Sequence, residues 1–252
     1  MSPDSSRTVA DVNIYYSVDP DPRARFWRSA EVTSSGDNWT APLPILSRDQ
    51  PLFAFANVAY DLPLSASEPY GRPTSRFALS SLLHTVTPQD LQATGVRATE
   101  QPSMLIDDFS HGWRDWYVLS GDNRHHWEYS TRKLADPQWQ GRAGQRLKIT
   151  VQADQPNDLV LILTENFFRT YRGKMQESVA IVPLTGGAEP QTISLAAEDF
   201  EPAGTGDAPA WKNVDLLSLR PYYDRGPQLV GSKTWAGPHP KFLRLEWGEG
   251  ER

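Results

Sequence analysis

Cysteine is absent from this chain of 252 residues, which excludes a disulfide framework and any metal centre built from thiolates. No apolar run approaches the ~18–20 residues that a membrane-spanning helix needs, so we expect no membrane span. The segment from Met1 to Ser6 also lacks the apolar core of a signal peptide. Two interpretations of localisation stay open: a cytoplasmic protein, or part of a longer secreted or periplasmic one. The resemblances described below favour the second.

Basic stretches are missing as well. The formal net charge is −6, and acidic residues outnumber basic ones before and after residue 100. A protein that binds a phosphate backbone concentrates Lys and Arg on one face or along one helix. We therefore expect no nucleic-acid partner.

Aromatic residues, proline and glycine are plentiful. Phe, Trp and Tyr make up 11% of the chain, which also contains 21 prolines and 17 glycines. Buried aromatic rings remove large areas from water, while frequent proline and glycine favour short strands joined by turns over long helices. The composition predicts an all-β fold.

Residues 1–99 are predicted to form a small sandwich of the immunoglobulin or fibronectin type. Alternating or aromatic-rich runs indicate strands at Val9–Ser17, Arg25–Trp27, Pro51–Tyr60 and Phe77–Thr85. Thr87 followed by Pro88 is typical of a helix start, with the threonine as N-cap. We place a domain boundary between residues 99 and 100.

Three aromatic-rich motifs stand out in about fifty residues of this first module. They are Tyr15-Tyr16-Ser17-x-Asp19-Pro20-x-Pro22-x-x-Arg25-Phe26-Trp27, Trp39-Thr40-Ala41 and Pro51-Leu52-Phe53-Ala54-Phe55-Ala56-Asn57-Val58-Ala59-Tyr60. This pattern resembles the β-module that follows the catalytic domain in large bacterial α/β-hydrolases of the planctomycete and PhoPQ-activated-like type. It implies an upstream or partner hydrolase. The chain itself has no Gly-x-Ser-x-Gly nucleophile elbow.

Residues 100–252 are predicted to form a second β-sandwich. Leu147, Ile149 and Val151 alternate with polar residues, whereas Leu159–Leu163 is continuously apolar, as in a strand covered on both faces. Three further motifs in this half are Asp107-Asp108-Phe109, Glu198-Asp199-Phe200 and Trp211-Lys212-Asn213-Val214-Asp215-x-Leu217-x-Leu219. With these motifs, the half resembles the galactose-binding-like jelly roll that several carbohydrate-binding modules share.

An aromatic-rich stretch in this half supplies candidate sugar-binding residues. A pyranose ring needs a flat aromatic platform for its apolar face and polar groups around its rim. The candidates are Trp113, Trp116, Trp127 and Trp139 as platforms, with Arg124, His125 and Glu128 at the rim. Most of these rings are equally compatible with a core position. Two later segments, Tyr222–Gly226 and Trp235–His239, form a possible rival site.

The jelly-roll resemblance also implies a structural calcium ion. Calcium prefers several oxygen ligands, and Asp107 or Asp108 together with Asp215 offers carboxylates at the start and end of the second module. The alternative is that these aspartates cap turns or face solvent. The adjacent pair His125-His126 is a poor zinc site, because neighbouring strand residues point in opposite directions.

Two enzymatic alternatives stay open. A glycosidase needs two converging carboxylates, for which Glu128, Glu165 and Glu177 are available. A polysaccharide lyase could use Tyr129 with His126 and Arg132. The leading prediction is a non-catalytic carbohydrate-binding module that targets an attached or partner enzyme to a polysaccharide. The second is a structural tail of a hydrolase with no ligand of its own, and the third is a stand-alone polysaccharide-active enzyme.

Overall fold

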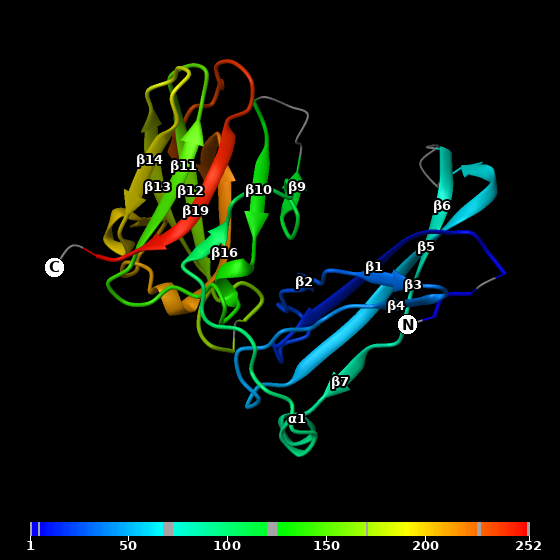
Figure 1. Ribbon diagram of the computed structural model, residues 1–252. Coiled ribbons are helices and arrows are strands. Elements are labelled where there is room, and N and C mark those ends of the chain that lie inside the picture. Colours follow the sequence, from blue (N-terminus) through cyan, green and yellow to red (C-terminus); the bar gives the residue numbers. More distant parts are fainter. Residues whose placement is uncertain are drawn as a thin grey trace. The chain divides into compact units, whose positions relative to one another are not determined.

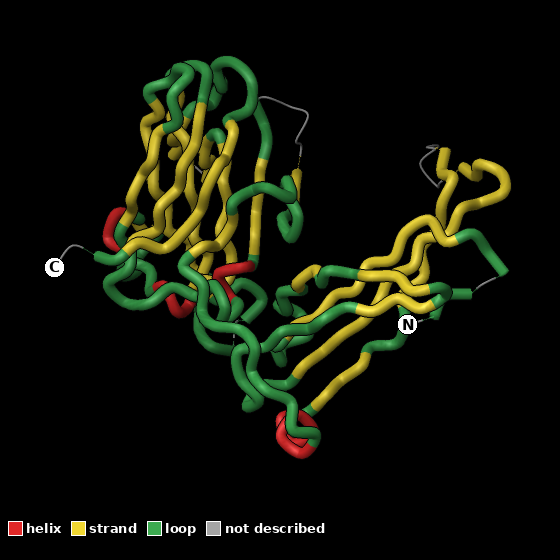
Figure 2. Tube along the Cα trace, in the orientation of Figure 1, coloured by secondary structure: helices red, strands yellow, loops and turns green. Residues whose placement is uncertain are grey.

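A computed structural model describes residues 2–4, 6–67, 73–119, 125–169, 171–225 and 228–250 of the chain. The polypeptide divides into two compact units, Met1–Glu100 and Gln101–Arg252. Both consist almost entirely of antiparallel strands (Figure 1; Figure 2). The described part contains a single α-helix, and the other segments coloured as helix in Figure 2 are short 3₁₀ turns. The predicted all-β sandwich architecture is confirmed. No helix in these ranges is long and apolar enough to cross a membrane.

The first unit is built on a five-stranded sheet with the order β2-β1-β5-β6, in which β7 also pairs with β5. A separate hairpin joins β3 to β4. The strands of this unit are β1 (Val9–Ser17), β2 (Arg28–Ser29), β3 (Thr33–Ser35), β4 (Asn38–Thr40), β5 (Leu52–Ser67), β6 (Pro73–Ser80) and β7 (His84–Val86).

Two small apolar clusters line one face of this sheet, because alternate residues of β1 and β5 point to the same side. Val12, Val58 and Tyr60 pack with Trp39 of the hairpin. The other cluster includes Tyr16, Ile45 and Leu52.

A short helix closes the second cluster. Leu91 of α1 (Pro88–Ala93) is buried beside Tyr16 and Ile45. Thr87 caps the helix: its side chain accepts from the Asp90 amide, and the Asp90 carboxylate accepts from the Thr87 amide. The predicted helix start is confirmed.

Two strand boundaries in the first unit differ from the prediction. The strand expected at Arg25–Trp27 is irregular, and pairing with β1 begins at Arg28. The single strand expected over Phe77–Thr85 is two strands, β6 and β7, which pair with different parts of the long strand β5. Sequence alternation does not reveal that break, because residues on both sides of it keep an extended conformation.

The second unit is a sandwich of a six-stranded and a four-stranded sheet. The six-stranded sheet has the order β15-β13-β12-β16-β10-β9, and the four-stranded sheet has the order β14-β11-β19-β8. The strands are β8 (Leu105–Asp107), β9 (Tyr117–Leu119), β10 (Glu128–Thr131), β11 (Arg146–Gln152), β12 (Asn157–Glu165), β13 (Gln176–Leu184), β14 (Gln191–Leu195), β15 (Glu201–Pro202), β16 (Val214–Arg220) and β19 (Lys241–Gly248). Short 3₁₀ turns lie at Lys133–Ala135, Ala197–Asp199 and Trp211–Asn213.

One continuous core lies between these two sheets. Leu147 and Ile149 of β11 and Leu161 and Leu163 of β12 all have no exposed surface and belong to the same cluster. We call the side of the six-stranded sheet that faces this core its inner face, and the opposite side its outer face. Because side chains alternate along a strand, every second residue of β10, β12 and β16 reaches the outer face.

A hairpin of β17 (Tyr222–Arg225) and β18 (Gln228–Gly231) covers part of the outer face. Tyr223 packs there against Val160 and Ile162, which explains the continuously apolar β12. Gly231 has φ of +89°, and a Cβ at this position would lie 2.5 Å from Val160 Cγ2. Only glycine therefore lets the hairpin approach the sheet this closely.

Candidate functional site

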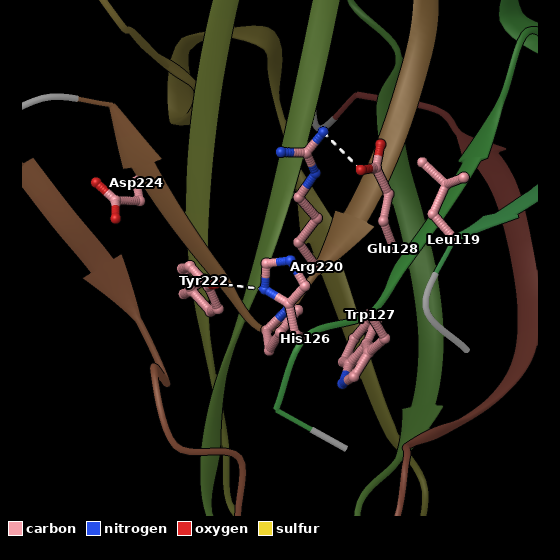
Figure 3. Close-up of a pocket in the computed structure, with 8 residues that line it drawn as sticks. Leu119, His126, Trp127, Glu128, Arg220, Tyr222 and Asp224 are labelled. Carbon is pink, nitrogen blue, oxygen red and sulfur yellow. Dashed lines mark hydrogen bonds and ion pairs between the residues drawn. The ribbon is translucent and has the colours of Figure 1, made fainter. Parts of the chain in front are cut away.

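The outer face of the six-stranded sheet contains a pocket beside the β17–β18 hairpin. Its volume is about 380 Å³. We call it the outer-face pocket, and Figure 3 shows the side chains around it. Its lining residues are Leu119, His126, Trp127, Glu128, Arg220, Pro221, Tyr222 and Asp224.

An ion pair lies at the centre of the outer-face pocket. Ser130 of β10 is paired with Ser218 of β16, so Glu128 and Arg220 stand at neighbouring positions on adjacent strands and point to the same side. Arg220 Nη2 lies 2.7 Å from Glu128 Oε2, and the two side chains are 37% and 18% exposed. The pair is therefore open to solvent on one side only.

The two serines below this pair fix the carboxylate. Glu128 Oε1 accepts a hydrogen bond from Ser130 Oγ at 2.5 Å and one from Ser218 Oγ at 3.2 Å. The two serine hydroxyls are also 2.8 Å apart, and both residues are buried. Because each hydroxyl has one proton, these three contacts share two hydrogen bonds. A carboxylate held by Arg220 and by this serine pair, on two strands, is a rigid acceptor, which is what a binding site for polar groups requires.

A histidine and a tyrosine form the second polar contact of the pocket. His126 Nδ1 and Tyr222 Oη are 2.5 Å apart, although 96 positions separate them in the chain. His126 is exposed just before β10, and Tyr222 is half-buried at the start of β17. Figure 3 shows both rings beside the Arg220 side chain.

The pocket wall combines apolar and acidic side chains. Leu119, on the edge strand β9, is 57% exposed. Asp224 of β17 stands on the opposite side of the pocket from Leu119 (Figure 3). Trp127 is only 3% exposed, and its indole Nε1 has no hydrogen-bond partner in the described part of the chain.

The predicted aromatic platforms lie mostly inside the core. Trp116 and Trp127 are 8% and 3% exposed, so neither presents an open ring face to a ligand. Trp113 is half-buried and stacks on Tyr129, with ring centroids 3.8 Å apart and planes within 1° of parallel. These rings fill the sandwich with Phe242, and this packing is the physical reason why they do not form a surface platform.

Trp139 lies in a different place from the other three predicted platforms. It is half-buried, its backbone carbonyl accepts from the indole Nε1 of Trp247, and the Lys133 ammonium lies 5.6 Å from its ring centroid. It packs at the margin of the main core cluster and is not among the residues that line the outer-face pocket. Trp139 therefore does not extend the outer-face pocket.

The three residues predicted at the rim of the sugar site lie in different places relative to the outer-face pocket. Glu128 lines the outer-face pocket. His125 is half-buried and directly precedes the pocket residue His126. Arg124 lies outside the described residues, as does the rest of the segment 120–124.

The aspartates predicted to bind calcium have protein partners. Asp107 Oδ2 accepts from Lys133 Nζ at 2.5 Å and from Trp116 Nε1 at 2.8 Å. Asp108 accepts from the amide and hydroxyl of Ser110, and these hydrogen bonds lower its pKa. Asp108 therefore caps a turn, which is the alternative to calcium binding.

Asp215 pairs with arginine. Its Oδ1 lies 2.9 Å from Arg169 Nε, and both residues are buried, with 3% and 2% exposure. Burial raises the pKa of Asp215 despite the neighbouring guanidinium groups of Arg169 and Arg172. Within the described ranges, no cluster of three or more His, Asp or Glu residues could hold a metal. Calcium binding stays a prediction that no interaction here supports.

The residues considered for catalysis do not converge as expected. Tyr129 bonds to His239 through its hydroxyl, which lies 2.8 Å from Nδ1, while His126 bonds to Tyr222. Arg132 stacks beside Phe167 and Phe168.

The three glutamates considered for a glycosidase also have different partners. Glu177 accepts from the Tyr223 hydroxyl, and Glu165 accepts from the Ala210 amide. Of the three glutamates, only Glu128 lines the outer-face pocket.

A wider hollow of about 850 Å³ lies along residues 140–146 of the second unit. Arg146, at its border, bonds to Ser194 and Asp199, and the buried Trp211 donates to the Gln145 carbonyl. Asp199, the ion-pair partner of Arg146, does not line this hollow, whereas both members of the Glu128–Arg220 pair line the outer-face pocket. The outer-face pocket is the better candidate.

Sequence reasoning missed Arg220 and Leu119 and treated Tyr222 and Asp224 as part of a rival group. In the structure, Tyr222 and Asp224 line the same pocket as Glu128. The available signal was the opposite charge of Glu128 and Arg220 at the ends of two strands, but it becomes visible only once β10 and β16 are known to pair. In the other rival segment, Trp235 is buried and contacts Trp127 edge to face, so its ring presents no open face to a ligand.

Comparison of the chain with protein-family models, with curated proteins and with solved structures found no match.

Proposed function

We propose that this chain is a non-catalytic carbohydrate-binding module whose ligand site is the outer-face pocket. The observation that carries the proposal is the solvent-facing Glu128–Arg220 pair, held rigid by two buried serines. Such a pair offers an acceptor and a donor side by side, which matches the adjacent hydroxyl groups of a sugar ring.

The surroundings of the pair support the same function. Ligand sites combine apolar surface with a few placed polar groups, and their volumes are commonly about 300–1,000 Å³. The outer-face pocket, at about 380 Å³, has room for one sugar unit. Leu119 and the half-buried ring of Tyr222 provide apolar surface, and the His126–Tyr222 contact provides further polar groups.

The proposed role of the module is to bring an attached or partner enzyme to a polysaccharide. The resemblance of the first unit to accessory β-modules of bacterial hydrolases supports a hydrolase as that enzyme and a secreted or periplasmic location. Under this proposal the module contributes affinity for the polysaccharide, and the partner contributes the chemistry.

A structural role without a ligand is the second candidate. The observation that favours it is the position of the predicted platforms: Trp116 and Trp127 are buried, and Trp113 is stacked on Tyr129. A chain that uses its aromatic rings for its own core can serve to stabilise or orient a neighbouring domain.

Affinity gel electrophoresis of the intact chain separates the two candidates. Gels containing soluble neutral polysaccharides (galactan, xylan, mannan and mixed-linkage glucan) are compared with plain gels, with calcium and with EDTA. We expect retardation in at least one gel. Arg220→Met should weaken that binding about tenfold or more, the usual effect of removing a hydrogen bond to a charged group.

Arg244→Met is the matched control. Arg244 also pairs with a glutamate at 2.7 Å, through Nε and Glu246 Oε2, but it lies on β19 of the four-stranded sheet. It should bind like the wild type. No retardation in any gel would reject the binding function and leave the structural role. If Arg220→Met is retarded as strongly as the wild type, the sugar site lies outside the outer-face pocket.

A further inference from the structure

The outer-face pocket has a charge pattern that bears on the class of sugar it accepts. Its described lining residues include two carboxylates, Glu128 and Asp224, and one guanidinium, Arg220. That guanidinium is already paired with Glu128 at 2.7 Å. Arg220 is the only Lys or Arg side chain in the described lining, and a carboxylate already engages it; the imidazole of His126, the other basic group there, is bonded to Tyr222.

Glu128 cannot easily leave Arg220 to make room for another anion. Its Oε2 contacts Arg220, and its Oε1 accepts from Ser130 and Ser218, so two strands hold it in place. A carboxylate has about four acceptor positions. Because the two serine protons are shared among three short contacts, at least one position is left for a ligand. A hydroxyl group can fill it as a donor, whereas a carboxylate or sulfate cannot.

Arg220 retains a complementary donor capacity. A guanidinium carries five N–H groups in a fixed fork. The contact with Glu128 uses Nη2, Nε is buried, and the side chain is still 37% exposed. The remaining donors of this group lie beside the remaining acceptor position of Glu128, and two adjacent hydroxyls of one sugar can bridge the two residues.

We infer that the outer-face pocket selects neutral sugars and excludes uronic and sulfated ones, with Glu128 as the residue that sets this preference. This inference rests on the proposed carbohydrate-binding function and specifies its ligand class. Glu128 has two roles: it accepts from a ligand hydroxyl, and it occupies the guanidinium that a ligand anion would otherwise bind.

The test compares neutral polysaccharides with their uronic counterparts, because the paired sugars differ mainly at one carbon. Galactan is paired with polygalacturonate and mannan with polymannuronate, each at two ionic strengths. Wild-type chain should bind a neutral member of these pairs at least about tenfold more tightly than its uronic partner, as expected where one charged hydrogen bond discriminates.

Glu128→Gln is the decisive variant. Glutamine keeps the size and one acceptor oxygen but removes the negative charge, so it frees Arg220 for an anion. We expect neutral binding to fall and uronate binding to rise, with the ratio of the two affinities changing about tenfold or more. Glu246→Gln changes the net charge by the same amount outside the pocket, and it should leave that ratio unchanged.

The outcomes separate this inference from the proposed function. One outcome overturns the inference but keeps the binding function: the wild type binds the uronic polysaccharide as tightly as its neutral partner, and Arg220→Met abolishes that uronate binding. A ratio that Glu128→Gln leaves unchanged would overturn it as well. If neither class binds, the proposed function itself fails. Circular dichroism and melting temperature verify that each variant is folded, and Tyr222→Phe, which removes only a hydroxyl, tests the pocket if Glu128→Gln does not fold.

Discussion

The two faces of the six-stranded sheet come from the same strands but have opposite chemistry. On β16, Leu217 and Leu219 point inward and have no exposed surface, whereas Ser218 and Arg220 point outward into a polar network. The alternation of side chains along a strand makes this separation possible, because neighbouring residues serve different faces. Under the proposed function, substitutions at neighbouring residues of one strand should therefore alter stability and binding separately.

The outer face is itself divided. Near β12 and β13 it is apolar and covered by the β17–β18 hairpin, through Tyr223 on Val160 and Ile162. Near β10 and β16 it is polar and borders the outer-face pocket. The hairpin thus covers the apolar half of the outer face and forms one wall of the pocket on the polar half.

Leu161→Ala on the inner face should have the largest effect on stability. Leu161 has no exposed surface, and its loss leaves a cavity in the core. We expect a decrease of about 2–5 kcal/mol in the free energy of unfolding, measured by urea denaturation. Ile181→Ala is the control on the outer side, where Ile181 is 45% exposed, and it should cost well under half as much. Equal losses would contradict the assignment of the two faces.

Tyr129→Phe should change stability by an intermediate amount that depends on pH. Burial raises the pKa of Tyr129 above its ordinary value of 10.0. The stabilising contribution of the protonated phenol is therefore complete below about pH 10 and decreases as the pH rises toward the folded-state pKa.

Melting temperatures of the wild type and Tyr129→Phe between pH 8 and 11 test this expectation. At pH 8 the variant should be less stable by about 1 kcal/mol, because its hydrogen bond with His239 is lost. Above pH 10 the difference should shrink, since phenylalanine does not ionise. A constant difference would show that Tyr129 ionises as easily in the folded chain as in the unfolded one, and a growing difference would show that it ionises more easily when folded; either would contradict the expectation.

Arg220→Met should have the smallest effect on stability despite its large expected effect on binding. A partly exposed ion pair contributes little to folding, about 0–1 kcal/mol. Urea denaturation of the variant should give a free energy of unfolding within about 1 kcal/mol of the wild type. A loss as large as that of Leu161→Ala would make Arg220 a structural residue and remove the contrast between the two faces.

The strands of the second unit were largely predictable from sequence, because burial imposes a visible pattern. Leu147, Ile149 and Val151 alternate and lie on β11, with one face buried. The continuous run Leu159–Leu163 predicted a strand covered on both faces, and all of its residues are buried. Short or edge strands such as β9 escaped prediction because three residues carry too little pattern.

The candidate site was only partly predictable. Glu128 was identified from its polar and aromatic neighbours, but Arg220 was not, because the pairing of β10 with β16 joins residues about ninety positions apart and leaves no local signal. Trp116 and Trp127 were overestimated as ligand contacts for a related reason. A tryptophan that fills a sandwich core and one that stacks on a sugar look the same in sequence.

Amide chemical-shift mapping with a neutral oligosaccharide is the most direct test of the central claim that the outer face binds sugar while the inner face maintains the fold. The ligand is taken from the neutral polysaccharide that retards the chain, and the full chain is labelled with ¹⁵N. We predict that the largest shifts cluster at Glu128, Arg220 and Tyr222 and are absent in Arg220→Met. Shifts centred on Trp113 or Trp139, or none at saturating sugar, would contradict the account.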